Sequence, residues 1–251
     1  MSKQWKIAAA NLGLRMYTRL GGNFKDKAHF QPEQVFERIV IFSTSALGDL
    51  MFNTPAIRAV RERYPAANIT LISSHKNKQL VATSRCFNQV IYWDHKAKDM
   101  LGVIRQLRQH RPQLAIILHS KSPYDVMVAI TAGCQYVFKD AYGNKATGME
   151  PWLCGVSRST GGHLIQRKLD LVAQLGCQSD NTEMFIPVEF TPVAKAAGKI
   201  SIGLQMGASE TLRCWPVAQF IRLAKLLLAS SPHHQIEFCL LYTSPSPRDT
   251  R

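Results

Sequence analysis

The chain has 251 residues, of which 46% are apolar, and carries 31 Lys and Arg side chains against 17 Asp and Glu. This composition excludes a disordered, collagen-like or coiled-coil protein. No apolar run approaches the roughly 18 residues that span a bilayer, and the six cysteines lack the spacing of a zinc site, so we expect a soluble cytoplasmic protein with reduced thiols. The formal charge of +14 favours an anionic partner: nucleic acid, a lipid surface or a phosphorylated substrate.

The N-terminal segment, residues 1–35, is typical of a basic amphipathic helix followed by a polar connector. Trp5, Leu12, Met16 and Leu20 recur at helical spacing, and two arginines occupy another face. Two interpretations stay open at this point. The helix either packs on the body of the protein or lies on an anionic lipid surface.

Four apolar runs of β type alternate with helical stretches in the next part of the chain. The runs are Arg38–Ser43, Asn68–Ser73, Gln89–Trp93 and Leu114–His119. The intervening helices are expected at Leu50–Tyr64, from about Lys78, and at Met100–His110. Runs that are apolar throughout indicate parallel strands with both faces covered. Residues 36–190 are therefore predicted to form a doubly wound, Rossmann-like α/β domain.

The strand signal weakens beyond Gly133. The segment Tyr142–Gly162, rich in Gly, Ser and Thr, is predicted to be a loop. A helix is expected next, at His163–Leu175, and Gly176 ends it.

A second Rossmann-like domain starts after a linker at residues 191–198. A strand from Lys199 and a helix at Val217–Ala229 place the start of this domain at residues 199–240. One or two strands and one helix cannot enclose a core, so we expect a truncated second domain and an inactive fragment. Residues 241–251 lose all periodicity and are predicted to be a non-native or disordered tail.

The densest chemical signal is the turn between the first strand and its helix, which contains Gly48 and Asp49. In an open parallel sheet, ligands bind beyond the carboxyl ends of the strands, so this turn lies where a site belongs. Glycine permits close approach of a ligand. For the aspartate, the alternatives are a helix N-cap and a catalytic carboxylate.

Three stretches resemble glycosyltransferase family 9, the lipopolysaccharide heptosyltransferases. Gly-Asp, then Thr-Pro-Ala-Ile-Arg, then a basic helix ending in Tyr-Pro resembles the family's N-terminal signature. Ile202–Phe220 resembles the opening of its donor half, and His163–Gly176 the helix before its interdomain linker. The resemblance implies a GT-B architecture and an inverting, metal-independent transfer of heptose from ADP-heptose to the lipopolysaccharide inner core. It implies a nucleotide-sugar donor and no separate cofactor.

The resemblance also implies roles for individual residues. Asp49 matches the proposed general base, which takes the proton of the attacking hydroxyl. Arg213 stands where the family commonly has Lys, and its charge would balance the departing diphosphate. Ser209 and Thr211 would donate hydrogen bonds to phosphate near a helix start, although an ordinary polar loop would look the same.

Five residues are candidates for the acceptor side: Gly48, Asn53, His119, Lys121 and His163. The loop after the fourth strand departs from the family's Asp-x-Gln-Gly type of sequence, which puts the identity of the acceptor in doubt. His119 and Lys121 could contact acidic acceptor groups, but a histidine that ends a strand is more often only a satisfied polar residue. His163 could equally serve as a plain helix start.

The expected partners are a nucleotide-sugar, a lipid A-core acceptor and, for a peripheral protein, the anionic inner face of the inner membrane. Two alternatives stay open. The first is another GT-B sugar-nucleotide enzyme, a hexosyltransferase or an epimerase. The second is a non-enzymatic basic protein that binds nucleic acid or a membrane surface. Nucleic acid is not expected, because the sequence has no RNA-recognition aromatics, helix-turn-helix spacing or zinc finger.

Overall fold

A computed structural model describes residues 3–141, 147–158, 162–191, 197–208 and 211–239. The chain divides into two compact units, Met1–Glu189 and Phe190–Arg251, which we describe separately. None of the helices in the described ranges combines the length and apolar character needed to cross a membrane.

The first unit is built on a six-stranded, all-parallel sheet in the order β3-β2-β1-β4-β5-β6. The strands are β1 (Arg38–Ser43), β2 (Asn68–Ser73), β3 (Gln89–Tyr92), β4 (Leu114–His119), β5 (Tyr136–Ala141) and β6 (Gly155–Arg158). This order is that of a Rossmann fold, and its direction reverses between β1 and β4. The predicted doubly wound α/β class is confirmed.

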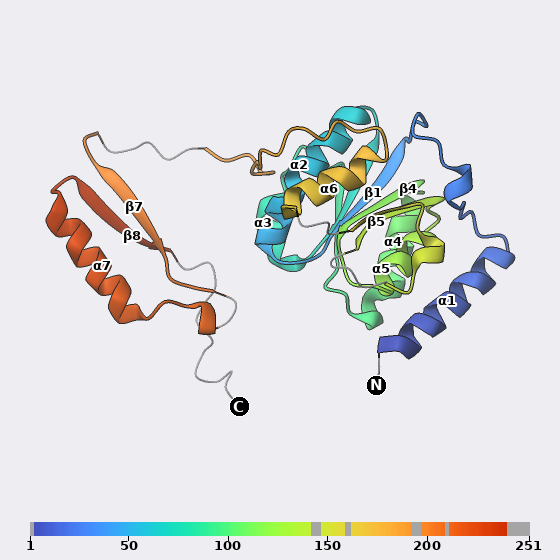
Figure 1. The fold of residues 1–251 in the computed structure, drawn as a ribbon, viewed down its shortest axis with the longest axis horizontal. Helices are drawn as coiled ribbons and strands as arrows, with labels where there is room; N and C mark the ends of the chain where they lie inside the picture. The colour runs from blue at the N-terminus through green and yellow to red at the C-terminus, as the bar shows by residue number, and fades with distance from the viewer. Residues whose placement is uncertain (1–2, 142–146, 159–161, 192–196, 209–210, 240–251) are drawn as a thin grey trace. The chain divides into compact units, whose positions relative to one another are not determined.

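Helices cover both faces of this sheet (Figure 1). They are α1 (Lys3–Arg19), α2 (Leu47–Arg63), α3 (Lys78–Val81), α4 (Met100–Gln109), α5 (Tyr124–Thr131) and α6 (Leu164–Ala173), with 3-10 turns η1 (Lys27–His29), η2 (His75–Asn77), η3 (Ala97–Asp99) and η4 (Glu150–Trp152). Residues of α2 and α6 pack on one face of the sheet, whereas α1, α4 and α5 pack on the other.

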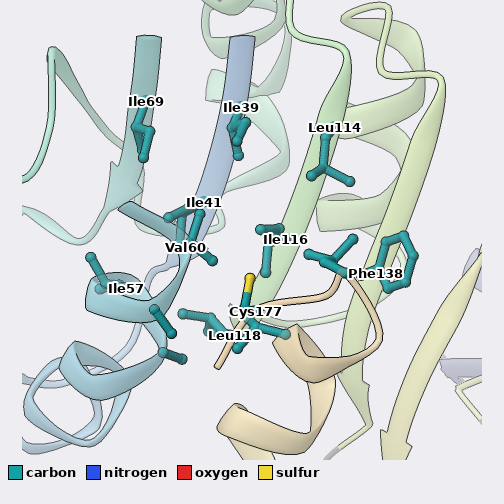
Figure 2. Packing of buried hydrophobic residues seen from close by; sticks show 14 of the residues in the cluster. Ile39, Ile41, Ile57, Val60, Ile69, Leu114, Ile116, Leu118, Phe138 and Cys177 are labelled. Carbon is teal, nitrogen blue, oxygen red and sulfur yellow. The ribbon is translucent and has the colours of Figure 1, made fainter. Parts of the chain in front are cut away.

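Successive side chains of each buried strand serve opposite cores, because side chains alternate across a strand. Ile39 and Ile41 of β1 point toward α2 and α6, where they meet Ile116 of β4 (Figure 2). Val40 and Phe42 point the other way and join the core under α1, α4 and α5. The strands are therefore apolar on both sides, as the sequence predicts.

The sheet is larger than expected, and the prediction that the strands weaken beyond Gly133 is wrong. β5 is buried along its whole length although it contains Lys139 and Asp140, the charges that disguise it in the sequence. The predicted loop at Tyr142–Gly162 also contains η4 and β6. Residues 142–146 and 159–161 of that loop lie outside the described residues.

The helix after β1 begins earlier than predicted. Its first residue is Leu47, and the N-cap is Ala46, which makes no side-chain capping hydrogen bond. Gly48 and Asp49 therefore belong to the first helical turn and not to the turn before it. Asp49 is at the third helical position, so the N-cap interpretation of this residue is wrong.

The second unit is a small βαβ arrangement. It consists of β7 (Ile200–Gln205), η5 (Thr211–Arg213), α7 (Val217–Ser230) and β8 (His234–Cys239). The two strands pair in parallel, with Ile200 opposite His234. Its buried core, within the described residues, consists of Leu204, Phe220 and Ala224. The predicted tail at 241–251 lies outside the described residues.

Candidate functional site

The candidate site lies at the carboxyl ends of β1 and β4. These strands are neighbours in the sheet, and Ser43 at the end of β1 pairs with His119 at the end of β4. The chain leaves β1 toward α2 on one face and leaves β4 toward α5 on the other. Such a topological switch point is where open α/β sheets bind their ligands.

Asp49 and His119 meet at this point. Asp49 Oδ1 lies 3.6 Å from His119 Nδ1, and the two side chains are 30% and 28% exposed. The separation is slightly longer than a hydrogen bond, and both groups are open to an approaching solute. Among the predicted site residues in the described part of the first unit, Asp49 and His119 are the one pair in which a carboxylate lies close to an imidazole.

The end of β4 is held in place by β1. Thr44 follows β1, and its backbone N–H and its hydroxyl both donate to the carbonyl oxygen of His119, at 2.9 and 3.2 Å. The strand register shifts between Phe42 and Ser43, which is a bulge-type irregularity. Irregularities of this kind next to a site redirect a side chain, here that of His119.

The carbonyl groups on either side of His119 are also held. The buried ammonium group of Lys168 donates to Leu118 O, and that of Lys139 donates to Ser120 O at 3.1 Å. Three consecutive carbonyls at this strand end therefore accept hydrogen bonds from fixed donors. The imidazole is mounted on a backbone that has little freedom to move.

The two lysines belong to a buried ion cluster beneath the site. Lys139 pairs with Asp125, and Lys168 pairs with Asp140. Arg167 also pairs with Asp140, with 2.7 Å between Nε and Oδ1. All five side chains are at most 8% exposed. Burying charges is costly unless they are paired, and here three cations share two carboxylates. The cluster joins β5, α5 and α6 and leaves one positive charge in excess.

The environment lowers the pKa of His119 below its ordinary value of 6.5. Burial is the largest cause, and repulsion from Lys168 acts in the same direction. Attraction to Asp49 and Asp140 opposes the shift without cancelling it. The imidazole is therefore neutral at pH 7 and can accept or relay a proton.

The remaining acceptor-side candidates differ in accessibility. Asn53 is completely buried, and its Nδ2 donates to Ser43 Oγ at 2.9 Å, so it fixes the end of β1 and has no surface for an acceptor. Gly48 is exposed, and a Cβ built there would meet no atom within 4 Å, which leaves open space beside Asp49. Lys121 is exposed in the loop after β4.

His163 is the N-cap of α6. Its Nδ1 accepts a hydrogen bond from the backbone N–H of Ile165 at 3.3 Å, and its ring stands edge-on to that of Phe52 in α2 at 5.9 Å. The capping nitrogen is occupied, so the plain helix-start interpretation describes the geometry. The ring still borders the first turns of α2.

Sequence reasoning missed the contribution of the loop after β3. His95 has a left-handed backbone, with φ 61°, and its Nε2 contacts Thr44 Oγ1. Burial lowers the pKa of this imidazole as well. A strained non-glycine residue at a strand end is a recurrent sign of a functional site. The only sequence signal was a histidine shortly after an apolar β-run.

The predicted donor residues belong to the second unit. Thr211 and Arg213 form η5, between β7 and the start of α7, and Arg213 is exposed. A loop that leads into a helix N-terminus suits an anion. Ser209 lies outside the described residues. No cluster of His, Cys, Asp or Glu that could hold a metal occurs in the described part of the chain.

The fold matches several solved structures. The glycosyl transferase family 9 protein from Veillonella parvula DSM 2008 aligns with a TM-score of 0.65 and 18% identity, over 82% of this chain and 63% of that one. The chain has the fold of a family 9 glycosyltransferase. E. coli ADP-heptose lps heptosyltransferase II aligns at 0.61 and 18% identity, over 80% and 63% of the two chains.

E. coli heptosyltransferase WaaC, in a structure with ADP, aligns at 0.62 and 14% identity, over 83% of this chain and 67% of that one. The chain thus spans about 63% of the length of the first two of these family 9 structures. No family model and no curated protein matches the sequence.

Proposed function

We propose that this protein is an inverting GT-B glycosyltransferase that transfers a sugar from a nucleotide-sugar to a hydroxyl group of an acceptor. The observation that carries the proposal is the partly exposed carboxylate of Asp49 beside His119, at the switch point of the sheet. The specific reaction is transfer of heptose from ADP-heptose to the inner core attached to lipid A. The heptosyltransferases among the structures with this fold support that choice.

Asp49 acts as the general base. The oxygen of the acceptor hydroxyl attacks the anomeric carbon of the donor, the bond from that carbon to the nucleoside diphosphate breaks, and the hydroxyl proton passes to the carboxylate. A single displacement of this kind inverts the anomeric configuration. A positioned base contributes typically 10²–10⁴-fold to such a step. Neutral His119 lies beside the carboxylate without forming an ion pair with it.

The donor side supplies positive charge to the leaving group. Arg213 balances the charge that develops on the departing diphosphate, and the hydroxyls of Ser209 and Thr211 bind its oxygens. Arginine can hold a diphosphate through two parallel hydrogen bonds, whereas the lysine common in the family acts as a point charge.

The proposal is tested by measuring transfer with the full-length protein that carries this sequence. Turnover with ADP-heptose should exceed turnover with ADP- and UDP-hexoses, and Asp49→Asn should lower it by roughly 100-fold or more. The matched control is Asp170→Asn, which alters an exposed carboxylate on α6.

Equal loss in both variants, or unchanged turnover in Asp49→Asn, would refute the general-base assignment. Faster turnover with a hexose donor would support the glycosyltransferase assignment but would show that heptose is not the donor sugar.

A further inference from the structure

Helix α1 is fastened to the first unit by one face only. Ala10 and Leu14 are buried in the core under α4 and α5. Between them, Asn11 Nδ2 donates to Gly148 O at 2.9 Å, and Asn11 Oδ1 accepts from Trp152 Nε1 at 2.7 Å. This face accounts for the interpretation in which the helix packs on the body of the protein.

The opposite face of α1 and the residue after it carry large apolar side chains that nothing in the described first unit covers. Trp5, Leu12, Met16 and Leu20 are 47%, 63%, 57% and 86% exposed. Their spacing of seven, four and four residues places them in one stripe along the helix. We call these four residues the outer face of α1.

The charged side chains within α1 and α4 are all basic, and Asp99 is the N-cap that precedes α4. Helix α1 contains Lys3, Lys6, Arg15 and Arg19 and no acidic residue. Helix α4 adds Arg105 and Arg108 and also lacks acids. The single acid in α5 is Asp125, which is buried against Lys139. This side of the unit therefore presents cations beside exposed apolar groups.

A groove of about 470 Å³ between α4 and α5 continues the same surface. Its lining combines the apolar side chains of Met100, Ile104 and Met127 with Arg105 and Arg108. It adjoins the C-terminal end of α1, because Tyr17 Oη and Arg108 Nε both donate to Thr131 O, at 3.5 and 3.0 Å.

We propose that the outer face of α1, together with this groove, docks the protein on an anionic phospholipid bilayer. An amphipathic helix with apolar side chains on one side and basic groups beside them lies in the plane of the membrane interface. The apolar stripe enters the headgroup boundary while Arg15, Arg19, Arg105 and Arg108 contact lipid phosphates. A second copy of this chain fits poorly, because it would bring cations against cations.

The first test uses Trp5 as a reporter in the 251-residue chain. Trp93 and Trp152 are buried and Trp215 is exposed, so Trp215→Phe leaves Trp5 as the exposed indole. With vesicles of phosphatidylcholine containing phosphatidylglycerol, its emission should shift to the blue and its quenching by acrylamide should fall. Phosphatidylcholine vesicles alone should have little effect, and about 0.5 M salt should reverse the change, because salt screens surface charges.

The second test compares charge reversals of equal size. Arg15→Glu with Arg19→Glu should lower the vesicle partition coefficient by roughly 10-fold or more, since each cation near an anionic surface contributes measurably. Arg222→Glu with Lys225→Glu makes the same change in net charge on exposed residues of α7 and should leave partitioning nearly unchanged. Leu12→Glu with Met16→Glu should abolish insertion of Trp5 while the thermal midpoint stays within a few degrees, because both residues are exposed.

Three results would overturn the proposal: equal loss in the two charge-reversed variants, unchanged insertion in Leu12→Glu with Met16→Glu, or insertion that is the same for neutral and anionic vesicles. If Leu12→Glu with Met16→Glu instead converts a dimer to a monomer in sedimentation and leaves vesicle binding unchanged, the outer face of α1 is a self-association surface. Binding is measured without any sugar substrate, so a failure of the glycosyltransferase proposal leaves this result intact.

Discussion

A carboxylate beside a neutral imidazole can still accept a proton, whereas a carboxylate in an ion pair is a weaker proton acceptor. Burial and Lys168 keep His119 neutral, so the imidazole brings no positive charge to the Asp49 carboxylate that is to accept the proton of an incoming hydroxyl. The ion cluster below supplies this environment and at the same time fixes the backbone of His119. One set of buried residues therefore sets both the charge and the position of the pair.

The lowered pKa of His119 makes stability depend on pH. The unfolded chain binds a proton at this residue near pH 6.5, whereas the folded chain binds it only at lower pH. The free energy of unfolding should therefore have its full share from His119 above about pH 6.5 and lose it as pH falls through the folded pKa. His119→Asn removes this dependence, so urea unfolding of wild type and variant should converge between pH 7.5 and 5.5.

The control for that comparison is His163→Asn, because asparagine can keep the helix cap of this exposed residue. A wild-type curve that runs parallel to that of His119→Asn across the whole range would show that the imidazole is not held neutral.

Removing the Asp49 side chain should cost little stability. At the third helical position it interacts with the positive end of the helix dipole but does not cap it, so Asp49→Ala should lower the free energy of unfolding by about 0.3–1 kcal/mol. The measurement is the urea midpoint beside the transfer rate. A loss of several kcal/mol with proportionate loss of rate would assign Asp49 a structural role.

Among the secondary-structure elements, β5 and α6 are joined by charge. Lys168 of α6 reaches Asp140 of β5 and Leu118 O of β4, so Lys168→Met should leave Asp140 with Arg167 as its cation and remove the side-chain donor to Leu118 O. Because Asp140 keeps its ion pair with Arg167, the cost is that of the hydrogen bonds lost with a charged donor, about 1.5–3 kcal/mol. We expect a loss of this order in urea unfolding, against almost none for Lys98→Met, which alters an exposed lysine in η3. Losses of equal size would mean that the cluster contributes nothing specific.

The strands that could be predicted from the sequence are those whose buried side chains are apolar. Arg38–Ser43, Asn68–Ser73 and Leu114–His119 agree with the structure at both ends, because an apolar run bounded by polar residues has few other uses. β5 was underestimated because Lys139 and Asp140 interrupt its pattern, and their partners come from α5 and α6. No local rule foresees that kind of compensation.

The sequence predicted both residues of the site, Asp49 and His119, but not that they lie side by side. Asp49 belongs to a recognisable sequence motif just after a strand, and His119 ends another strand. Their meeting depends on β1 and β4 being neighbours, which the order of elements along the chain does not state. No sequence motif marks the two lysines that donate to the carbonyls beside His119. A lysine can donate to a backbone carbonyl from any part of the chain that the fold brings close, so the contact leaves no local pattern.

At the scale of the whole molecule, the two units differ in how much they bury. The first has two apolar cores that sandwich a six-stranded sheet, whereas the described core of the second consists of Leu204, Phe220 and Ala224. The smaller unit should therefore open first. Limited proteolysis should cut between residues 190 and 239 and leave a stable fragment near 1–189. A single cooperative unfolding transition with no such fragment would contradict this.

The strand order also has a consequence for folding kinetics. Strands β1–β3 and β4–β6 are each contiguous in the chain, and the two halves join along one seam, where Ile39 lies opposite Leu114. Closing that seam bridges a longer stretch of chain than pairing Ile39 with Ile69 in β2, and distant pairings form more slowly. Asp49 comes from one half and His119 from the other, so their approach to each other should coincide with the late, rate-limiting step of folding.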